Sequence, residues 1–130
     1  MEVTIVGAYG YTGQLICEAF DNSGIRFNVA GRNIHDLEEV KKKFSTVSYC
    51  LQLDMIKEDD INILFLKSDI IVNCAGPFNE ESSLLLEKAA RSGKHYIDIT
   101  GELGFVKNSF EKHHLNAKES NSIIVHACAF

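Results

Sequence analysis

Short apolar runs alternate with amphipathic stretches along this chain of 130 residues, and the alternation predicts its secondary structure. Six runs have the composition of strands: Val3–Val6, Phe27–Ala30, Tyr49–Leu53, Asp69–Cys74, His95–Ile99 and Ser122–Ala127. Five stretches between them are predicted to be helices: Gly13–Phe20, the segment from Asn33 to Phe44, Asp59–Leu66, the segment between Phe78 and Gly93, and Phe105–Lys118. Asn33 is expected to cap the second helix, and Gly93 to follow the end of the fourth.

Strands that alternate with helices through short connections are parallel strands joined by right-handed crossovers, so helices cover both faces of the sheet. The continuous apolar run Asp69–Cys74 is typical of a strand that is covered on both faces. The sequence therefore predicts one α/β domain over residues 1–130, a doubly wound parallel sheet (Rossmann fold) with six strands in the order 3-2-1-4-5-6. A ligand is expected at the switch point between strands one and four.

Three glycines at a spacing of three, Gly7, Gly10 and Gly13, directly follow the first strand. Between a strand and a helix, this spacing brings a dinucleotide pyrophosphate onto the free N–H groups of the first helical turn, where the helix dipole favours an anion. The first glycine permits a tight turn, the second lets the backbone approach phosphate, and the third lets the helix pack against the strand. The sequence predicts a dinucleotide-binding loop.

The side chains of this loop, Tyr9, Tyr11 and Thr12, are also expected at the cofactor. Thr12 either donates a hydrogen bond to phosphate or caps its own helix, and the sequence favours both equally. Tyr11 packs either against the cofactor or against the floor of the site.

The second strand ends in Ala30-Gly31-Arg32. NAD-binding folds usually have Asp or Glu here, and its carboxylate holds the ribose 2′-hydroxyl. An acidic group would repel a 2′-phosphate, whereas a guanidinium forms a bidentate, charge-assisted pair with it. The sequence therefore predicts that Gly31 and Arg32 contact the cofactor and that NADP is preferred over NAD. The alternative is an exposed arginine beside a turn.

Two further strand ends supply candidate cofactor contacts. Asp54 closes the third strand, where its carboxylate either accepts a hydrogen bond from the adenine amino group or caps the next helix. The fourth strand ends at the expected switch point, where small residues would let the ribose and nicotinamide lie against the backbone. The candidates there are Cys74, Ala75, Gly76, Pro77 and Phe78.

The fifth strand ends beside the expected nicotinamide position, and its acidic residues are weak catalytic candidates. Asp98 or Glu102 would orient a substrate or transfer a proton. The structural alternative is favoured: Asp98 satisfies backbone N–H groups at a turn, and Glu102 begins a helix. The catalytic residues therefore stay unknown. His113 and His114 lie in the middle of a helix and are assigned to its solvated face.

Composition limits the classes of partner. The net charge of −5 argues against nucleic acid or an anionic membrane as the main partner, since both need a basic face. No apolar run approaches a membrane span and no signal-like start precedes the first strand, so a cytoplasmic protein is predicted. The four cysteines have no metal-binding spacing, so we predict no metal site and interpret them as buried small apolar residues.

The chain resembles the N-terminal NADP-binding domain of saccharopine dehydrogenase-like oxidoreductases, a group that includes saccharopine reductase and trans-acting enoyl reductases. Four segments carry the resemblance: Gly7-Ala8-Tyr9-Gly10-Tyr11-Thr12-Gly13, Ala30-Gly31-Arg32, Asn73-Cys74-Ala75-Gly76-Pro77-Phe78 and Tyr96-Ile97-Asp98-Ile99-Thr100-Gly101-Glu102. They occur in the family's order and spacing across nearly the whole chain. The resemblance implies nicotinamide-dependent reduction, with NADP(H) the more common cofactor.

The chain departs from the family pattern in two places. Tyr9 stands where relatives more often have threonine. At Cys128-Ala129-Phe130, alanine replaces the glycine of a Cys-Gly-Phe-Asp-Ser-like segment that leads, in the family, into the substrate and dimerisation domain. We therefore expect a truncated or partial chain without that domain.

Two functions follow as expectations. The first is the cofactor-binding half of an NADP-dependent oxidoreductase that transfers a hydride, inactive as an isolated chain. The second is a regulatory module that senses the dinucleotide without catalysis. The small-molecule substrate is unknown, and a homodimer stays open for the full-length protein.

Overall fold

The computed structural model describes residues 1–80 and 82–129. Strands and helices alternate throughout these residues, as the apolar pattern predicts. The elements are β1 (Val3–Val6), α1 (Tyr11–Asn22), β2 (Phe27–Gly31), α2 (Ile34–Lys43), β3 (Val47–Gln52), α3 (Glu58–Leu66), β4 (Ile70–Asn73), α4 (Ser83–Ser92), β5 (His95–Asp98), α5 (Leu103–Ser120) and β6 (Ile124–Val125). Phe130, the last residue of the segment Cys128-Ala129-Phe130 that differs from the family pattern, lies outside the described residues.

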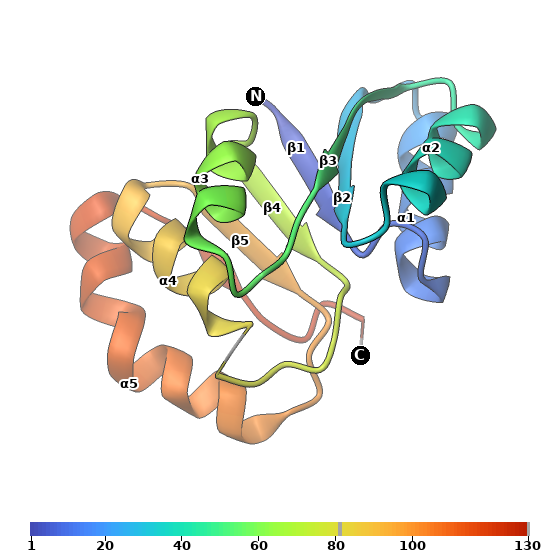
Figure 1. Ribbon diagram of the computed structural model, residues 1–130. Coiled ribbons are helices and arrows are strands. Elements are labelled where there is room, and N and C mark those ends of the chain that lie inside the picture. Colours follow the sequence, from blue (N-terminus) through green and yellow to red (C-terminus); the bar gives the residue numbers. More distant parts are fainter. Residues whose placement is uncertain (81, 130) are drawn as a thin grey trace.

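Within the described residues, the strands form one parallel sheet in the order β3-β2-β1-β4-β5-β6, which confirms the predicted topology. Helices α1 and α2 cover one face, and α3, α4 and α5 cover the other (Figure 1). Strand order reverses between β1 and β4, where Val6 pairs with Asn73. The segments that follow these two paired strand ends lead to helices on opposite faces of the sheet, α1 and α4, and this leaves a crevice between them.

Two apolar clusters, one on each face, hold the helices to the sheet. Ile5 and Val29 point into the cluster beneath α1 and α2, together with Leu37 of α2. Val6 and Ile71 point into the cluster beneath the other three helices. Neighbouring positions of β1 thus enter opposite layers, which is the strand period of two, and both layers exclude water from the central strands.

Local signals explain most element ends. The Asn33 side chain accepts hydrogen bonds from the backbone N–H groups of His35 and Asp36, so it caps α2 as predicted. Gly93 follows α4 with a φ of 70°, a conformation in which glycine has no steric penalty.

Some boundaries differ from those predicted. Helix α1 begins at Tyr11 rather than Gly13, and β3 spans Val47–Gln52 rather than Tyr49–Leu53. Strand β6 is only Ile124–Val125 instead of Ser122–Ala127. Within the described sheet, β6 is an edge strand that pairs with β5 alone, and the chain after it turns towards Asp98 through hydrogen bonds.

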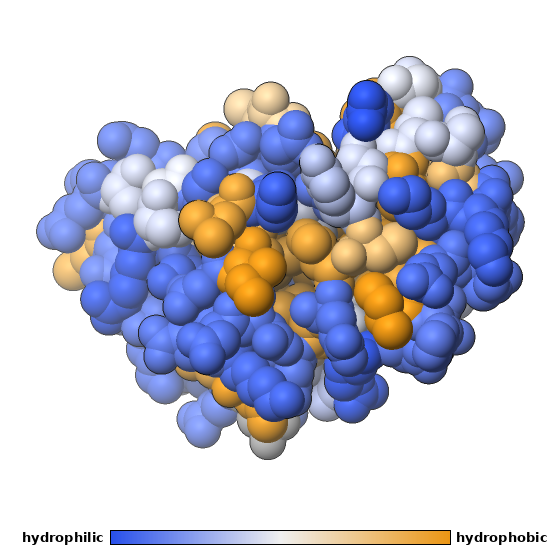
Figure 2. Space-filling view, turned by 45° about the horizontal axis from the view of Figure 1, so that its top comes forward, coloured by the Kyte–Doolittle hydropathy of each residue, from blue (hydrophilic) through white to orange (hydrophobic). Residues whose placement is uncertain are grey.

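The surface carries polar and apolar regions. The face shown in Figure 2 is mainly hydrophilic, and apolar residues gather in a strip across its middle. No helix within residues 1–80 and 82–129 is long and apolar enough to cross a bilayer. Cys17 is buried in α1 as expected, Cys50 and Cys74 are half-buried, and Cys128 is exposed, so the interpretation of all four cysteines as buried is wrong at Cys128 and only partly correct at Cys50 and Cys74.

His113 corrects a second prediction, because it is buried rather than solvated. Its exposed fraction is 8%, and its Nδ1 atom has no hydrogen-bond partner among the described residues. Burial lowers the pKa of this imidazole below its usual value of 6.5, and nearby Arg91 and Lys112 lower it further, against the opposing effect of Glu87. His113 therefore favours the neutral form in the folded protein. His114 is exposed, as predicted.

This burial predicts a pH-dependent loss of stability. As pH falls below about 6.5, the unfolded chain protonates His113 before the folded chain does, so the free energy of unfolding decreases. The contribution of neutral His113 to the free energy of unfolding is fully present above pH 6.5, and it is lost as pH falls towards the lowered pKa of this imidazole in the folded chain. His113→Leu should flatten this decrease between about pH 7 and 5 in urea unfolding measured at each pH, since it removes the titrating group. His114→Leu should leave the decrease unchanged; an unchanged slope in His113→Leu would contradict the assignment.

Candidate functional site

The glycine loop joins β1 to α1 and presents backbone N–H groups. Gly7 has a φ of 76°, and its N–H donates to the carbonyl oxygen of Ala30 at 2.8 Å. A Cβ at Gly13 would lie 2.2 Å from the carbonyl oxygen of Gly7, so only glycine lets α1 start this close to the loop. Gly10 is the N-cap of α1 and supplies no side-chain cap, and the first turn holds no acidic residue. The N–H groups of this turn can therefore donate hydrogen bonds to an anion.

The loop forms one wall of a cleft of about 440 Å³ at the carboxyl edge of the sheet. Ten of the predicted cofactor-binding residues line it: Gly7, Tyr9, Gly10, Gly31, Arg32, Asp54, Cys74, Ala75, Gly76 and Pro77. They come from the ends of β1, β2, β3 and β4, which the parallel sheet brings to one edge (Figure 1). The residues that the sequence did not indicate are Val6, Leu53, Met55, Ile56, Asn79 and Ser82.

Four predicted cofactor residues do not line this cleft. Tyr11 is 84% exposed, and Gly13 packs beneath the loop. Thr12 lies inside the first turn of α1, after the N-cap Gly10, so the prediction that it caps this helix is wrong. Phe78 is buried against Phe105, with ring centroids 5.6 Å apart, and packs α5 onto the sheet.

Arg32 lies at the rim of the cleft, directly after β2. Its side chain is exposed, and among the described residues it has no ion pair. Its carbonyl oxygen accepts a hydrogen bond from Gln52 Nε2 at 3.1 Å, which ties this turn to the end of β3. The guanidinium is thus available to an anion beside the end of β2.

Asp54 borders the same rim but does not cap a helix. The N-cap of α3 is Lys57, so the capping role predicted for Asp54 is wrong. Instead, Asp54 Oδ1 accepts a hydrogen bond from the Ile56 N–H at 3.2 Å, and the Asp54 N–H donates to Asp60. One carboxylate oxygen therefore orders the turn, and Met55 and Ile56 are held against the cleft.

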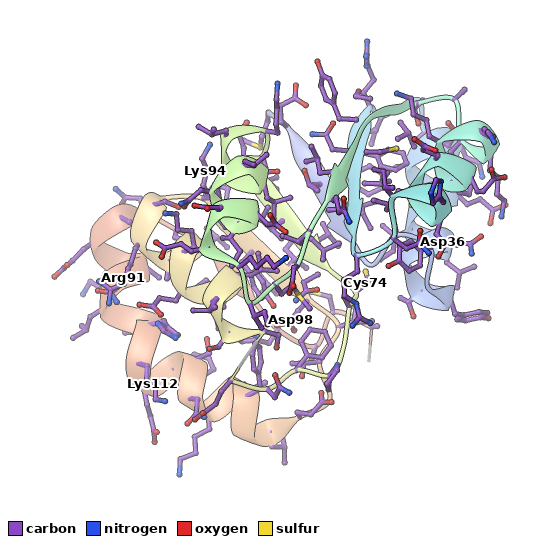
Figure 3. All side chains as sticks on the ribbon, viewed as in Figure 1. Asp36, Cys74, Arg91, Lys94, Asp98 and Lys112 are labelled. Atoms are coloured by element: carbon purple, nitrogen blue, oxygen red, sulfur yellow. The ribbon has the colours of Figure 1, made fainter. Side chains whose placement is uncertain are left out.

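Cys74 forms part of the cleft at the carboxyl end of β4, as its label in Figure 3 shows. Burial raises the pKa of its thiol to about 11, so the group is a neutral, protonated thiol at pH 7. Asn73, next to it, accepts the Ala75 N–H through Oδ1 and donates to the Tyr96 hydroxyl through Nδ2. These two hydrogen bonds of Asn73 fix the turn after β4.

Asp98, at the end of β5, is fully buried and joins three elements (Figure 3). Its Oδ1 accepts the Thr100 N–H at 3.1 Å, as the structural alternative predicts, and also the Ala127 N–H at 3.2 Å. Its Oδ2 lies 2.7 Å from His126 Nδ1, and His126 Nε2 lies 2.8 Å from Ser109 Oγ. Asp98 thereby fastens the segment after β6 and the middle of α5 to β5.

This Asp98–His126–Ser109 group has the order of hydrogen bonds that activates a serine nucleophile. Ser109 is 5% exposed and sits within helix α5, and a nucleophile has to reach its substrate. Burial and the carboxylate of Asp98 also raise the pKa of the adjoining Tyr96 hydroxyl, which stays neutral. We interpret the group as a buried fastening.

Glu102 is the N-cap residue of α5, where the sequence predicts that it begins a helix. Its Oε2 accepts hydrogen bonds from Thr100 Oγ1 at 2.6 Å and from the Gly101 N–H at 3.0 Å. The Thr100 bond is the main cause that lowers the pKa of this exposed carboxyl group. The Glu102 carboxylate is thus hydrogen-bonded to the residues just before α5.

The fold and the cleft define a doubly wound α/β domain whose cleft lies at the switch point between β1 and β4. Comparison with known families identifies it further: the model of the saccharopine dehydrogenase NADP-binding domain matches residues 3–126, so the chain belongs to that family. This confirms the resemblance drawn from the glycine loop, Arg32 and the two later motifs.

Among curated proteins, the chain is 27% identical over 140 residues to a lipid droplet localized protein of Caenorhabditis elegans and 28% identical over 134 residues to a trans-acting enoyl reductase of Mycobacterium leprae. The matches cover 99% of this chain but 33% and 32% of those proteins. The chain therefore spans about a third of the length of these relatives.

Two solved structures share the fold at low identity. Apo saccharopine dehydrogenase (L-Glu forming) from Saccharomyces cerevisiae superposes with a TM-score of 0.79 at 13% identity, over 98% of this chain and 27% of that one. The complex of leucoanthocyanidin reductase with NADPH from Vitis vinifera gives 0.66 at 14% identity, over 97% and 46%.

Proposed function

We propose that this chain binds NADP(H) in preference to NAD(H) and is the cofactor-binding part of an oxidoreductase. The observation that carries the preference is Arg32: an exposed guanidinium without an ion pair among the described residues, at the rim of the cleft that begins at the glycine loop. Family membership supports NADP as the cofactor. A carboxylate, which would select the 2′-hydroxyl of NAD, is replaced by a cation here.

The residues present fit such a cofactor. The uncapped first turn of α1 would hold the pyrophosphate, Arg32 the 2′-phosphate, and the small residues Ala75 and Gly76 the nicotinamide half. NADP(H), when bound, supplies the hydride chemistry. The chain's own contribution is to bind and orient it, and the neutral thiol of Cys74 keeps that part of the cleft uncharged.

The proton-transfer groups are proposed to come from outside this chain. Asp98 is buried, and Glu102 is engaged in hydrogen bonds at the start of α5. As a separate polypeptide, the chain should therefore bind cofactor and turn over little substrate. The same observation favours a second function, a module that senses the dinucleotide without catalysis. Reduction of an enoyl group, named for the mycobacterial relatives, is one substrate chemistry consistent with the first proposal.

A titration tests the binding proposal directly. The emission of the reduced nicotinamide itself reports binding, because this group is excited at wavelengths that protein side chains do not absorb. Tight binding that is selective for NADPH over NADH supports the proposal. A folded chain that binds neither dinucleotide contradicts it.

Arg32→Ala is expected to weaken NADPH binding by about 10- to 100-fold and NADH binding by less than about threefold, since only NADPH carries the charged partner. Arg26→Ala is the matched control: Arg26 also is an exposed cation beside β2, but it precedes the strand and donates to Ser48 on the β3 side. It should leave both affinities unchanged. Equal losses for the two dinucleotides in Arg32→Ala would overturn the 2′-phosphate assignment.

A further inference from the structure

Tyr9 reaches from the glycine loop to the turn after β2. A Cβ at Gly31 would lie 2.7 Å from Tyr9 Cε1 and 3.1 Å from its hydroxyl oxygen, so the glycine makes room for this ring. The hydroxyl oxygen accepts a hydrogen bond from the Asn33 N–H at 3.3 Å. The loop end of the side chain is held as well, because Gln14 Nε2 donates to the Tyr9 carbonyl oxygen at 3.0 Å. The position of the hydroxyl is therefore set by contacts at both ends of the residue.

The hydrogen of the Tyr9 hydroxyl has no hydrogen-bond acceptor among the described residues. A phenol has one O–H to donate, and the bond from Asn33 uses only an acceptor site on the oxygen. Within residues 1–80 and 82–129, no acceptor takes that hydrogen. The donating N–H belongs to the N-cap residue of α2, at the positive end of the helix dipole. A hydroxyl that accepts from such a group becomes a better donor towards an anion.

We propose that the Tyr9 hydroxyl donates to the 2′-phosphate of NADP(H) and is, with Arg32, a specificity-determining group of this chain. The inference rests on the proposed function, because it needs the cofactor in the cleft that Tyr9 and Arg32 both line. Arg32 supplies the charge and follows Gly31 directly, whereas Tyr9 reaches Gly31 from the opposite wall. A 2′-hydroxyl, which carries no charge, gains far less from this donor.

The ring has a second effect. Besides the cleft, Tyr9 lines an adjoining hollow with two acidic residues, Asp36 and Glu39, and one basic residue, Lys43, whose ammonium group is bound to Gln14 Oε1. A phosphate group that entered this hollow would meet a net negative charge. Tyr9 keeps the 2′-phosphate on the side of Arg32, away from these two acidic residues of α2.

Tyr9→Phe tests the proposal because it removes the hydroxyl and retains the ring against Gly31. The full chain is titrated with NADPH and NADH, and with 2′,5′-ADP and 5′-ADP as probes of the adenosine half alone. We expect binding of NADPH and 2′,5′-ADP to weaken by about 5- to 20-fold, and binding of NADH and 5′-ADP to change by less than about twofold. Unchanged NADH binding shows that the loop is intact.

Tyr49→Phe is the matched control, since it removes a hydroxyl from an exposed tyrosine of β3 that does not line the cleft. It should change none of the four affinities. An equal change for phosphorylated and unphosphorylated ligands in Tyr9→Phe, no change, or tighter NADPH binding would each overturn the inference. Two outcomes separate this inference from the proposed function. If the wild-type chain binds no dinucleotide, both the proposed function and the role of the Tyr9 hydroxyl are wrong. If NADPH selectivity is lost in Arg32→Ala but kept in Tyr9→Phe, only the role of the Tyr9 hydroxyl is wrong.

Discussion

Gly13→Ala is expected to abolish detectable dinucleotide binding and to destabilise the fold. The new Cβ would lie 2.2 Å from the carbonyl oxygen of Gly7 and 2.9 Å from the Cα of Ala8. Both neighbours are backbone atoms, so no side-chain rotation relieves the overlap, and α1 has to move away from the loop. Overpacking of this kind costs about 1–3 kcal/mol or more. The N–H groups of the first turn would shift with the helix, and we expect NADPH affinity to fall by about 100-fold or more.

The measurement is a thermal unfolding curve together with the NADPH titration. Gly104→Ala is the control, because a Cβ there meets nothing within 4 Å and the residue lies in α5. Alanine should stabilise that helix by about 0.5–1 kcal/mol and leave binding unchanged. A Gly13→Ala chain that binds NADPH like the wild type would show that the close contact between loop and helix is not needed.

The sequence indicates the cleft well because its residues lie at strand ends. Once six strands alternate with five helices, all strands are parallel, and their carboxyl ends meet at one edge. Gly7, Arg32, Asp54 and Ala75 could therefore be placed together without knowledge of any side-chain contact. Met55 and Ile56 were missed, although they directly follow Asp54 and the same reasoning extends to them.

The interior face of α5 could not be predicted in the same way. Its buried residues recur at a spacing of four, but two of them, Ser109 and His113, are polar. Apolar periodicity does not detect such a face, particularly when Phe110 and Leu115 are exposed on the same helix. For the same reason His113 was assigned to solvent.

The partners of Asp98 depend on tertiary register. Only the pairing of Tyr96 with Ile124 brings His126 beside Asp98, and only the packing of α5 adds Ser109. As a single histidine without metal-ligand spacing, His126 gives no local signal of its role in the sequence. A carboxylate at the end of β5 and a histidine after the edge strand are a pattern that could have been found once the strand order was assumed.

Asp98→Ala should be the most destabilising of the substitutions proposed for this chain. It would leave the N–H groups of Thr100 and Ala127 and the imidazole of His126 without their acceptor, where Asp98 and Thr100 are fully buried. Each unsatisfied buried group costs about 1–3 kcal/mol, so we expect a total loss of about 3–5 kcal/mol and a fall in Tm of about 10 °C or more. Urea and thermal unfolding measure it.

Two variants separate the loss of the network from the loss of a charge. Asp98→Asn keeps an oxygen for Thr100 and Ala127 and should cost about 1–2 kcal/mol, because only the contact with His126 changes. Asp69→Ala removes a half-buried aspartate just before β4 that pairs with Lys94 and accepts the Glu2 N–H at a partly solvated site, and it should cost about 1 kcal/mol. If Asp98→Ala were no less stable than Asp69→Ala, the buried fastening would not hold α5 and the segment after β6. If Asp98→Asn kept its stability and its NADPH affinity, the carboxylate would be needed for neither, and the role of Asp98 would be to accept backbone hydrogen bonds.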